Sequence, residues 1–385
     1  MIIVSAVGML NALGDHPNDI SVNLAAGRAP GMGPDQGWLV QGQPCWTGRV
    51  TGRLPEIPAE LAEHRSRNNQ LLLAALAQIR PEVDEAISRV GADRVALVLG
   101  TSTSGLDEAD RFVSRRSDSY RYAQQELGDP SRFLAAFLGL NGPAYTLSTA
   151  CSSSSRAIIS GQRLIEAGLA DVAIVGGADT LSRMPINGFN SLESLSPTRC
   201  LPFSKQRAGI TIGEGAALML LERGERGVAV LGTGESSDAY HMSAPHPEGV
   251  GAVRAIEMAL RQARLQPQDV GYINLHGTAT RLNDQIESAV VNTIFGAAVP
   301  SSSTKHLTGH MLGAAGIGEA ALCWLLLTRD IMLPPQDFSR GEPDDALPPC
   351  GLLHAPARLE RPVILSNSFA FGGNNACLLL GTVNG

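Results

Sequence analysis

Short runs of apolar residues alternate along the chain with stretches in which apolar residues recur at helical spacing. Alternation of buried strands with amphipathic helices predicts a layered α/β fold. A further strand is predicted where the sequence opens, at Met1-Ile-Ile-Val. Two segments without periodicity, 32–60 and 334–361, are rich in Pro and Gly and predict surface loops. The strand-like runs cover 95–99, 172–176, 217–221, 228–231, 272–275, 363–366 and 376–380, and the helical patterns cover 68–79, 252–264 and 316–328.

A polar, glycine-containing break at 222–227 interrupts this pattern near the middle of the chain. We therefore predict two halves, residues 1–223 and residues 224–385. The two halves end alike, because 216–221 and 376–381 are both apolar runs that follow a glycine-rich turn.

Composition excludes several classes of function. With 385 residues and 44% hydrophobic content, the chain can bury a large core. Its net charge of −7 gives no general attraction to nucleic acid or to an acidic membrane surface. No apolar run reaches membrane-spanning length and no basic leader precedes the first strand, so we expect no membrane insertion. Six cysteines without metal-type spacing favour a reducing, cytoplasmic location.

The most distinctive local sequence is 144–156, Ala-Tyr-Thr-Leu-Ser-Thr-Ala-Cys-Ser-Ser-Ser-Ser-Arg. It predicts a short strand, a sharp turn and a helix that continues through Leu169. Cys151 is expected where that helix begins. Free N–H groups and the helix dipole favour a negative charge there, which predicts a lowered thiol pKa and a nucleophilic thiolate. The alternative is a buried structural cysteine, the common fate of a free thiol.

Two histidines occur in equally distinctive settings. His276 lies in Asn-Leu-His-Gly-Thr-Ala-Thr, and His310 ends Ser-Thr-Lys-His-Leu-Thr-Gly-His. A glycine-rich segment, Asn-Ser-Phe-Ala-Phe-Gly-Gly-Asn-Asn, follows at 367–375. One cysteine with two histidines suits covalent acyl transfer. The two histidines are not spaced as a helical metal pair and no third ligand is indicated, so we predict no metal.

These four segments, in this order and over essentially the whole chain, resemble the β-ketoacyl-acyl-carrier-protein synthases of the elongating class, which belong to the thiolase superfamily. The resemblance implies a thiolase-like layered α-β-α-β-α fold built from two duplicated halves. It also implies a decarboxylative Claisen condensation, in which an acyl group held on the cysteine joins malonyl-acyl carrier protein to give 3-oxoacyl-acyl carrier protein.

The resemblance carries roles to individual catalytic residues. Cys151 accepts the acyl group, and the amides of Cys151 and Phe371 stabilise the oxyanion. His276 and His310 hydrogen-bond to the malonyl thioester oxygen as it gains charge, and one neutral histidine can also deprotonate the nucleophile. Phe371 matches a gating phenylalanine. The residue before it is Ala370, where many members carry glycine, so the gate is expected to be stiffer or to hinge at the two glycines that follow.

Other residues are expected to support these. Lys305 and Glu319 form a pair that orients the histidines. Thr278 and Thr280 bind the phosphopantetheine arm, and Asp284 with Glu287 gives support. The remaining substrate-binding candidates are Phe369, Gly372 and Gly373. The enzyme needs no cofactor of its own, because the phosphopantetheine arrives on the acyl carrier protein. Basic residues that match carrier-docking positions are Arg65, Arg67, Lys205 and Arg207.

Three other readings stay open at the level of sequence. A thiolase acting on coenzyme A esters would use a second cysteine, but Cys377 is not in a Cys-Gly-Gly type loop. A noncatalytic chain-length factor would lack the nucleophile, and an initiating synthase carries Asn in place of His310. The pathway is also open between fatty acid synthesis and a type II polyketide such as an aryl polyene. The expected assembly is a homodimer, or a heterodimer with a chain-length-factor homologue.

Overall fold

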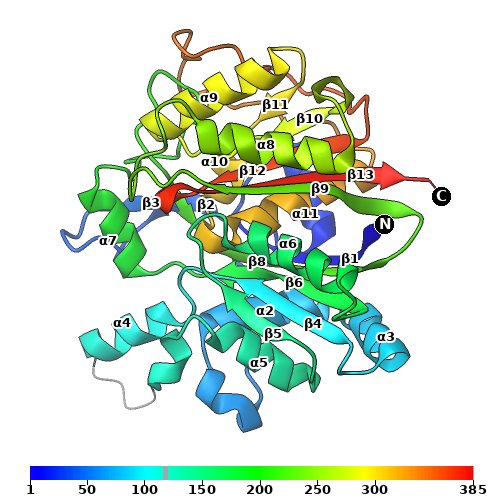
Figure 1. The fold of residues 1–385 in the computed structure, drawn as a ribbon. Helices are drawn as coiled ribbons and strands as arrows, with labels where there is room; N and C mark the ends of the chain where they lie inside the picture. Colours follow the sequence, from blue (N-terminus) through cyan, green and yellow to red (C-terminus); the bar gives the residue numbers. More distant parts are fainter. Residues whose placement is uncertain (116–119, 385) are drawn as a thin grey trace.

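The computed structural model describes residues 1–115 and 120–384, and its centre is a large mixed sheet (Figure 1). In the described residues ten strands join in the order β11-β10-β12-β13-β9-β1-β8-β6-β4-β5. They are β1 (Ile2–Leu10), β4 (Val95–Gly100), β5 (Ala144–Leu147), β6 (Val172–Asp179), β8 (Gly215–Arg223), β9 (Gly227–Ser237), β10 (Tyr272–Asn274), β11 (Ser301–Ser302), β12 (Val363–Phe369) and β13 (Asn374–Val383).

The sheet consists of two five-stranded sets with the same topology. In the first set β1 pairs antiparallel with β8, β8 antiparallel with β6, β6 parallel with β4, and β4 parallel with β5. In the second set β9, β13, β12, β10 and β11 repeat this pattern of directions in the same order. Among the described residues, strand pairing joins the two sets at Ile3–Ala229 and Val4–Val228. This repetition is the internal duplication of a thiolase-like fold, and the similar run-and-turn endings of the two halves are the equivalent strands β8 and β13.

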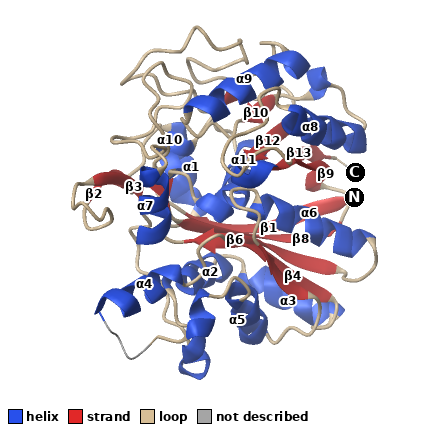
Figure 2. Ribbon diagram, turned by 60° about the vertical axis from the view of Figure 1, so that its left-hand side comes forward, coloured by secondary structure: helices blue, strands red, loops and turns tan. Residues whose placement is uncertain are grey.

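Helices form three layers around the two sets of strands (Figure 2). The central layer holds α6 (Ser153–Glu166) and α11 (Ala315–Thr328), which pack on each other and on strands of both sets. One outer layer holds α2 (Arg67–Ala77), α3 (Arg80–Val90) and α5 (Asp129–Leu138), and the other holds α8 (Val250–Ala263) and α9 (Arg281–Phe295). α11 is apolar on all sides and almost entirely buried, as a central helix must be.

Shorter elements complete the chain. A small sheet joins β2 (Met32–Asp35), β3 (Cys45–Gly48) and β7 (Ile212–Gly213). The remaining helices are α1 (Pro17–Ala25), α4 (Leu106–Arg115), α7 (Arg183–Ser191) and α10 (Lys305–Thr308). The short 3-10 turns are η1 (Ala59–His64), η2 (Tyr122–Gln125), η3 (Pro267–Asp269), η4 (Leu312–Ala314) and η5 (Phe371–Gly373).

Two expectations from the sequence need correction. The segment 32–60 is not only loop, because it contributes β2 and β3, which are too short to show an alternating pattern. β2 pairs with β3 inside the segment, and β3 also pairs with the distant β7. The helix after Cys151 ends at Glu166 and does not reach Leu169. The segment 334–361 contains no helix or strand, as expected. No helix among the described residues has the length and apolar character needed to cross a membrane.

Candidate active site

Cys151 lies in a tight turn between β5 and α6. Ala150 has a φ of 53°, in the left-handed region, and α6 begins at Ser153, so Cys151 precedes the N-cap residue Ser152. Ser153 fastens the turn, because its hydroxyl accepts the N–H of Thr149 at 2.9 Å and donates to the Ala150 carbonyl at 2.6 Å. The sequence placed Cys151 at the first turn of the helix, whereas it lies just before the cap. The turn therefore fixes the direction of the thiol.

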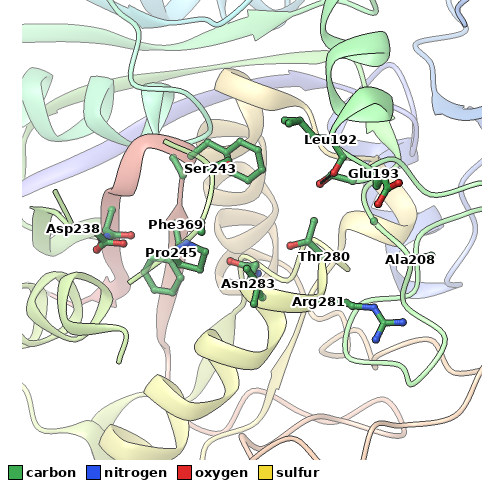
Figure 3. A pocket seen from close by; sticks show the side chains of 17 residues that line it. Leu192, Glu193, Ala208, Asp238, Ser243, Pro245, Thr280, Arg281, Asn283 and Phe369 are labelled. Carbon is green, nitrogen blue, oxygen red and sulfur yellow. Dashed lines mark hydrogen bonds between the residues drawn. The ribbon is translucent and has the colours of Figure 1, made fainter. Parts of the chain in front are cut away.

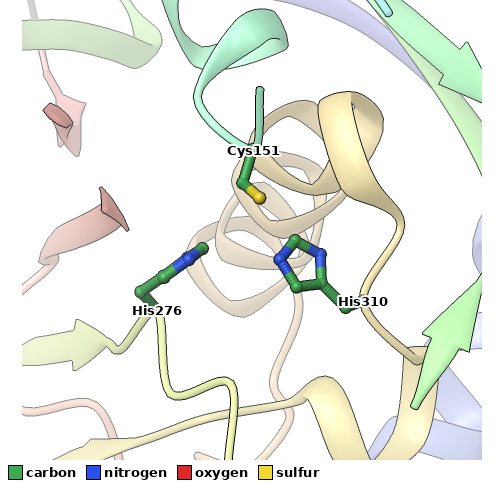
Figure 4. A group of neighbouring side chains, drawn as sticks. All are labelled: Cys151, His276 and His310. Atoms are coloured by element: carbon green, nitrogen blue, oxygen red, sulfur yellow. The ribbon is translucent and has the colours of Figure 1, made fainter. Parts of the chain in front are cut away.

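The structure brings Cys151, His276 and His310 together (Figure 4). One donor atom from each, the Cys151 Sγ and a ring nitrogen of each histidine, lies within 4.8 Å of the others. The two imidazole rings meet edge to face with centroids 5.4 Å apart. Cys151 comes from the first half and both histidines come from the second, His276 just after β10 and His310 just after α10. The site therefore lies where the two halves meet.

Lys305 and Glu319 form a buried pair beside His276. Both side chains are 1% exposed, and Lys305 Nζ donates to Glu319 Oε1 at 2.5 Å and to the His276 carbonyl at 2.6 Å. The same Nζ lies 3.4 Å from His276 Nδ1. The predicted Lys–Glu pair is thus formed, and it contacts His276 directly.

Burial controls the charge of the nucleophile. Loss of hydration raises the pKa of Cys151 to about 11, although the Lys305 ammonium and the Phe371 N–H act in the opposite direction. The expectation of a lowered pKa, drawn from the helix start, is therefore wrong. The thiol is protonated, and its proton must be transferred during attack on a thioester.

The two histidines are neutral. Burial, reinforced by Lys305, lowers the pKa of both imidazoles well below the usual value, and His310 lowers that of His276 further. The Leu312 N–H donates to His310 Nδ1 at 3.1 Å, so a neutral His310 carries its proton on Nε2. Lys305 Nζ faces Nδ1 of His276 and favours the same tautomer. Both rings can therefore offer an Nε2–H to an oxygen that gains negative charge.

A cation could be considered for the same three side chains. The sequence showed no third ligand, and the structure supplies Cys151 as one. However, the thiol is protonated and the Lys305 ammonium lies against His276, so the surroundings are electropositive. The prediction that the site holds no metal is kept on this argument.

Buried carboxylates hold the loops that carry the histidines. Glu287 accepts the N–H groups of His276 and Gly277 at 2.6 and 2.7 Å. Sequence analysis missed Asp179, at the end of β6, which accepts from Thr101 and Thr103 and from the N–H of Ala314 in η4. Asp179 thereby ties the loop after β4 to the segment after His310. Its signal in the sequence is a single acidic residue that ends a buried strand.

The glycine-rich segment closes the site. The Phe371 amide reaches Cys151, and its ring packs on Phe189 with centroids 5.4 Å apart. Gly372 and Gly373 have φ values of 79° and 77°, whereas Ala370 is extended at −90°. An alanine is therefore unstrained at 370, and the special backbone geometry lies at the two glycines.

A cavity of about 330 Å³ leads toward this segment (Figure 3). Phe369, Phe371 and Thr280 line it, and Cys151, which is 6% exposed, does not. The hydroxyls of Thr278 and Thr280 are 2.8 Å apart, and binding of the arm by these residues stays a prediction. The Phe369 ring lies 6.3 Å from that of His276. The cavity is thus an approach that ends at the closed Phe371 loop.

The four candidate docking residues differ in whether their positive charges are paired with carboxylates. Arg65 is exposed and forms no salt bridge within the described part of the chain. The other three have carboxylate partners. These pairs are Arg67 with Glu214 at 2.6 Å, Arg207 with Asp344 at 2.5 Å, and Lys205 with Asp345 and Glu342 at 3.2 and 3.4 Å. Docking at these positions stays a prediction, and Arg65 is the member with an unengaged charge.

Family models agree with this geometry. The β-ketoacyl synthase N-terminal domain matches residues 48–227 and the C-terminal domain matches residues 228–339. The chain belongs to the β-ketoacyl synthase family. It is therefore an acyltransferase that performs the condensation of an acyl group with a malonyl thioester, as the sequence predicted.

Individual β-ketoacyl synthases are similar over most of the chain. The 3-oxoacyl-[acyl-carrier-protein] synthase 2 of Synechocystis sp. is 30% identical, covering 98% of this chain and 97% of its own. A putative polyketide β-ketoacyl synthase 1 of Streptomyces cyaneus is 34% identical over 83% of each chain. A chain in the solved complex of the ketosynthase ApeO with its chain length factor ApeC, from Xenorhabdus doucetiae, is 65% identical. It covers 99% of this chain and 98% of its own, with a TM-score of 0.98.

Proposed function

We propose that this protein is the catalytic ketosynthase of a type II polyketide system that makes an aryl polyene, working with a chain-length-factor homologue and an acyl carrier protein. The observation that carries the catalytic role is the grouping of Cys151, His276 and His310 within 4.8 Å. The similarity to the ApeO–ApeC complex supports the partner and the class of pathway. The noncatalytic alternative has no use for this cluster.

In the first half-reaction, the Cys151 Sγ attacks the carbonyl carbon of the acyl thioester. Neither histidine takes up the thiol proton, because both rings already carry a proton on Nε2 and turn Nδ1 toward a donor, the Leu312 N–H for His310 and Lys305 Nζ for His276. The amides of Cys151 and Phe371 hold the oxyanion. Collapse of the tetrahedral intermediate breaks the bond between the carbonyl carbon and the sulfur of the arm. That sulfur takes up the proton lost by Cys151 and leaves as a thiol, and acyl-Cys151 remains.

In the second half-reaction, the malonyl thioester loses carbon dioxide, and the electron pair of the broken C–C bond forms an enolate. The Nε2–H groups of His276 and His310 donate to the enolate oxygen, where the charge develops. The enolate carbon then attacks acyl-Cys151, and the Cys151–acyl bond breaks. The product is a 3-oxoacyl thioester on the carrier, and the thiolate of Cys151 regains a proton.

No resident cofactor takes part in these steps. The phosphopantetheine arm is substrate, delivered by the carrier. Its amides are bound by Thr280, which lines the cavity, and by Thr278, whose hydroxyl lies 2.8 Å from that of Thr280. Lys305 stabilises the neutral, Nε2-protonated form of His276 through its contacts with Nδ1 and with the His276 carbonyl. Glu319 in turn fixes the ammonium.

The proposed partner pairs at the open edge of the sheet. β5 is the terminal strand of the sheet, with β4 on one side and no strand on the other in the described residues. An uncovered edge is a ready template for a second strand. In the parallel β4–β5 ladder the carbonyls of Pro143 and Leu147 point toward β4, so the N–H of Thr146 points outward by alternation. We propose that the equivalent strand of the homologue binds there.

Thr146→Pro tests this edge, because it removes an outward donor and leaves the β4 ladder intact. Thr146→Val is the matched control, since it keeps the N–H and loses only the hydroxyl bonded to Ser131. Co-expression with a homologue that lacks the cysteine should give a heterodimer with wild type and the Val variant but not with the Pro variant, by size exclusion with light scattering. A heterodimer with all three would contradict pairing through β5.

The catalytic assignment is tested by intact-protein mass after mixing with acyl carriers of different chain length. We expect one acyl adduct on Cys151 and, on adding malonyl carrier, release of carbon dioxide with loss of the adduct. Acceptance of long unsaturated acyl groups would support the aryl polyene pathway, and acceptance of short saturated ones alone would oppose it. Absence of any adduct would contradict the catalytic role.

A further inference from the structure

The cavity that leads to the site has an uneven distribution of charge. Three charged side chains line it in the described part of the chain, namely Glu193, Asp238 and Arg281. Arg281 is thus its single cation. Figure 3 shows Arg281 and Asp238 at opposite ends of the view, with Thr280 and Asn283 between them. A negatively charged group that enters this cavity can meet an opposite charge only at Arg281.

Arg281 is free to bind such a group. The residue is exposed, and its guanidinium has no salt bridge with any carboxylate of the described residues. Its backbone is fixed, because it is the first residue of α9 and its carbonyl accepts from Arg207 at 3.4 Å. The two carboxylates of the cavity differ from it. Asp238 is engaged by the N–H of His246 and by the Asn375 amide, and Glu193 lies at the end of α7.

The position of Arg281 along the chain gives it a definite place relative to the arm. It follows directly after Thr280, whose hydroxyl pairs with that of Thr278, and the same loop continues back to His276. The thioester of an entering arm would therefore lie at His276. Its amides would lie at Thr278 and Thr280, and its outer end would lie at Arg281. The outer end of phosphopantetheine is a phosphate, and a guanidinium offers it paired donors.

We propose that Arg281 forms a phosphate subsite at the mouth of the cavity, which binds the phosphate of the phosphopantetheine arm and sets how far the arm enters. The inference rests on the proposed function, because it requires a carrier-borne or coenzyme A-borne thioester as substrate. It adds a determinant that distinguishes phosphorylated arms from the same thioesters without phosphate. Glu193 and Asp238 also favour binding of the phosphate at Arg281, because their negative charges repel the phosphate from the other parts of the cavity.

The test compares two small thioesters that carry the same acyl group, acyl-pantetheine and acyl-4′-phosphopantetheine. The measured quantity is the second-order rate constant for acylation of Cys151, followed by intact mass, and the readout is the ratio of the phosphorylated to the unphosphorylated substrate. A charge-assisted pair that is partly exposed should give the wild type a ratio of about tenfold. Arg281→Gln should bring the ratio close to one, and added salt should lower it in the wild type only.

Arg254→Gln is the matched control, because Arg254 is exposed on the neighbouring helix α8 and does not line the cavity. It should keep the wild-type ratio. An unchanged ratio in Arg281→Gln would overturn the subsite. So would a loss seen only with the carrier-bound substrate, which would place Arg281 against an acidic group of the carrier protein instead. Failure of the proposed function is recognised separately, since the wild type would then form no adduct on Cys151 with either thioester.

Discussion

At the scale of single residues, Cys151 and the two histidines have different tasks: the cysteine holds a proton, and the histidines present hydrogen-bond donors. Cys151 is buried and holds its proton, with its pKa raised to about 11 by desolvation. The two neutral imidazoles expose donors because their Nδ1 atoms are turned toward Leu312 and Lys305. The reactive thiolate is therefore formed only during attack on a bound thioester, and the histidines are ready for the decarboxylation that follows.

Cys151→Ala should abolish condensation and leave the fold intact, because the side chain makes no structural hydrogen bond that the turn depends on. Intact mass should show no acyl adduct after incubation with an acyl carrier, while the thermal transition stays within a few degrees of the wild type. An adduct on another cysteine, or undiminished condensation, would refute the assignment.

His310→Ala should affect the two half-reactions differently. Acyl transfer to Cys151 should persist, because the amides of Cys151 and Phe371 still hold the oxyanion, whereas release of carbon dioxide from malonyl carrier should fall by at least about a hundredfold through loss of one donor to the enolate. Labelled carbon dioxide measures the second step and intact mass the first. Decarboxylation at the wild-type rate would show that His310 has another role.

Glu287 should make stability depend on pH. Burial raises the pKa of Glu287 from 4.5 to about 7, so this carboxyl loses its proton at a higher pH in the folded protein than in the unfolded chain. The wild type should therefore lose stability as pH rises from about 4.5 to about 7, and should be level above that. Glu287→Gln should lack this decline, so the difference in melting temperature between the two proteins should change across this window. Parallel melting curves from pH 5 to 8 would contradict the raised pKa.

At the scale of elements, the gate consists of the short turn between β12 and β13. Its strain lies in Gly372 and Gly373, and a Cβ at Gly373 would lie 2.7 Å from the Cβ of Asp238. The ring of Phe371 is held from outside by Phe189 of α7. Opening of the site must therefore move a turn that is packed against α7 on one side and against the Asp238 loop on the other.

Gly373→Ala should disturb this turn, because the residue has a positive φ and no space for a side chain. We expect a loss of roughly 1–3 kcal/mol in stability and a fall in condensation rate of about tenfold or more. Ala370→Gly is the control, since Ala370 already has an ordinary extended conformation, and its rate should stay within about twofold of wild type. A slow Ala370→Gly variant with a normal Gly373→Ala variant would place the hinge before Phe371.

Periodicity and motifs predicted the elements with strong local signals. All seven strand-like runs and all three helical patterns are present, and the Lys305–Glu319 pair that the family resemblance implied is formed. β2 and β3 were missed because strands of four residues show little alternation, and β3 also depends on its distant partner β7. The sign of the Cys151 pKa shift was missed because a helix start is a local feature, whereas burial depends on how the two halves close over the thiol.

At the scale of the whole molecule, duplication places equivalent elements opposite each other. β5 and α6 of the first half correspond to β11 and α11 of the second. Cys151 lies in the connection of the first pair and His310 in that of the second. α6 and α11 approach closely because Gly316 has no side chain, and a Cβ there would lie 2.1 Å from the Ser155 hydroxyl. The distance between Cys151 and His310 is thus set by the contact between the halves.

A group of arginines on the acidic molecule could receive an acidic carrier. Arg65 lines a hollow of about 600 Å³ together with Arg67, Arg111 and Arg121 and with the carboxylates Glu63 and Glu108. Arg65→Glu should raise the Michaelis constant for carrier-bound substrate and leave reaction with a small thioester unchanged. Arg67 is unsuitable for the test, because its pair with Glu214 would be broken. An equal loss with both substrates would show misfolding or a direct role in the site.

All six cysteines are buried, the nucleophile among them, and burial raises the pKa of each thiol. With its pKa raised to about 11, Cys151 is protonated in nearly all molecules at neutral pH. A cysteine introduced on the surface would therefore react with maleimide dyes well ahead of every native thiol. Fluorescent labels can be attached to an active enzyme without removing any cysteine, which makes the motion of the gate and the arrival of the carrier accessible to distance measurements in solution.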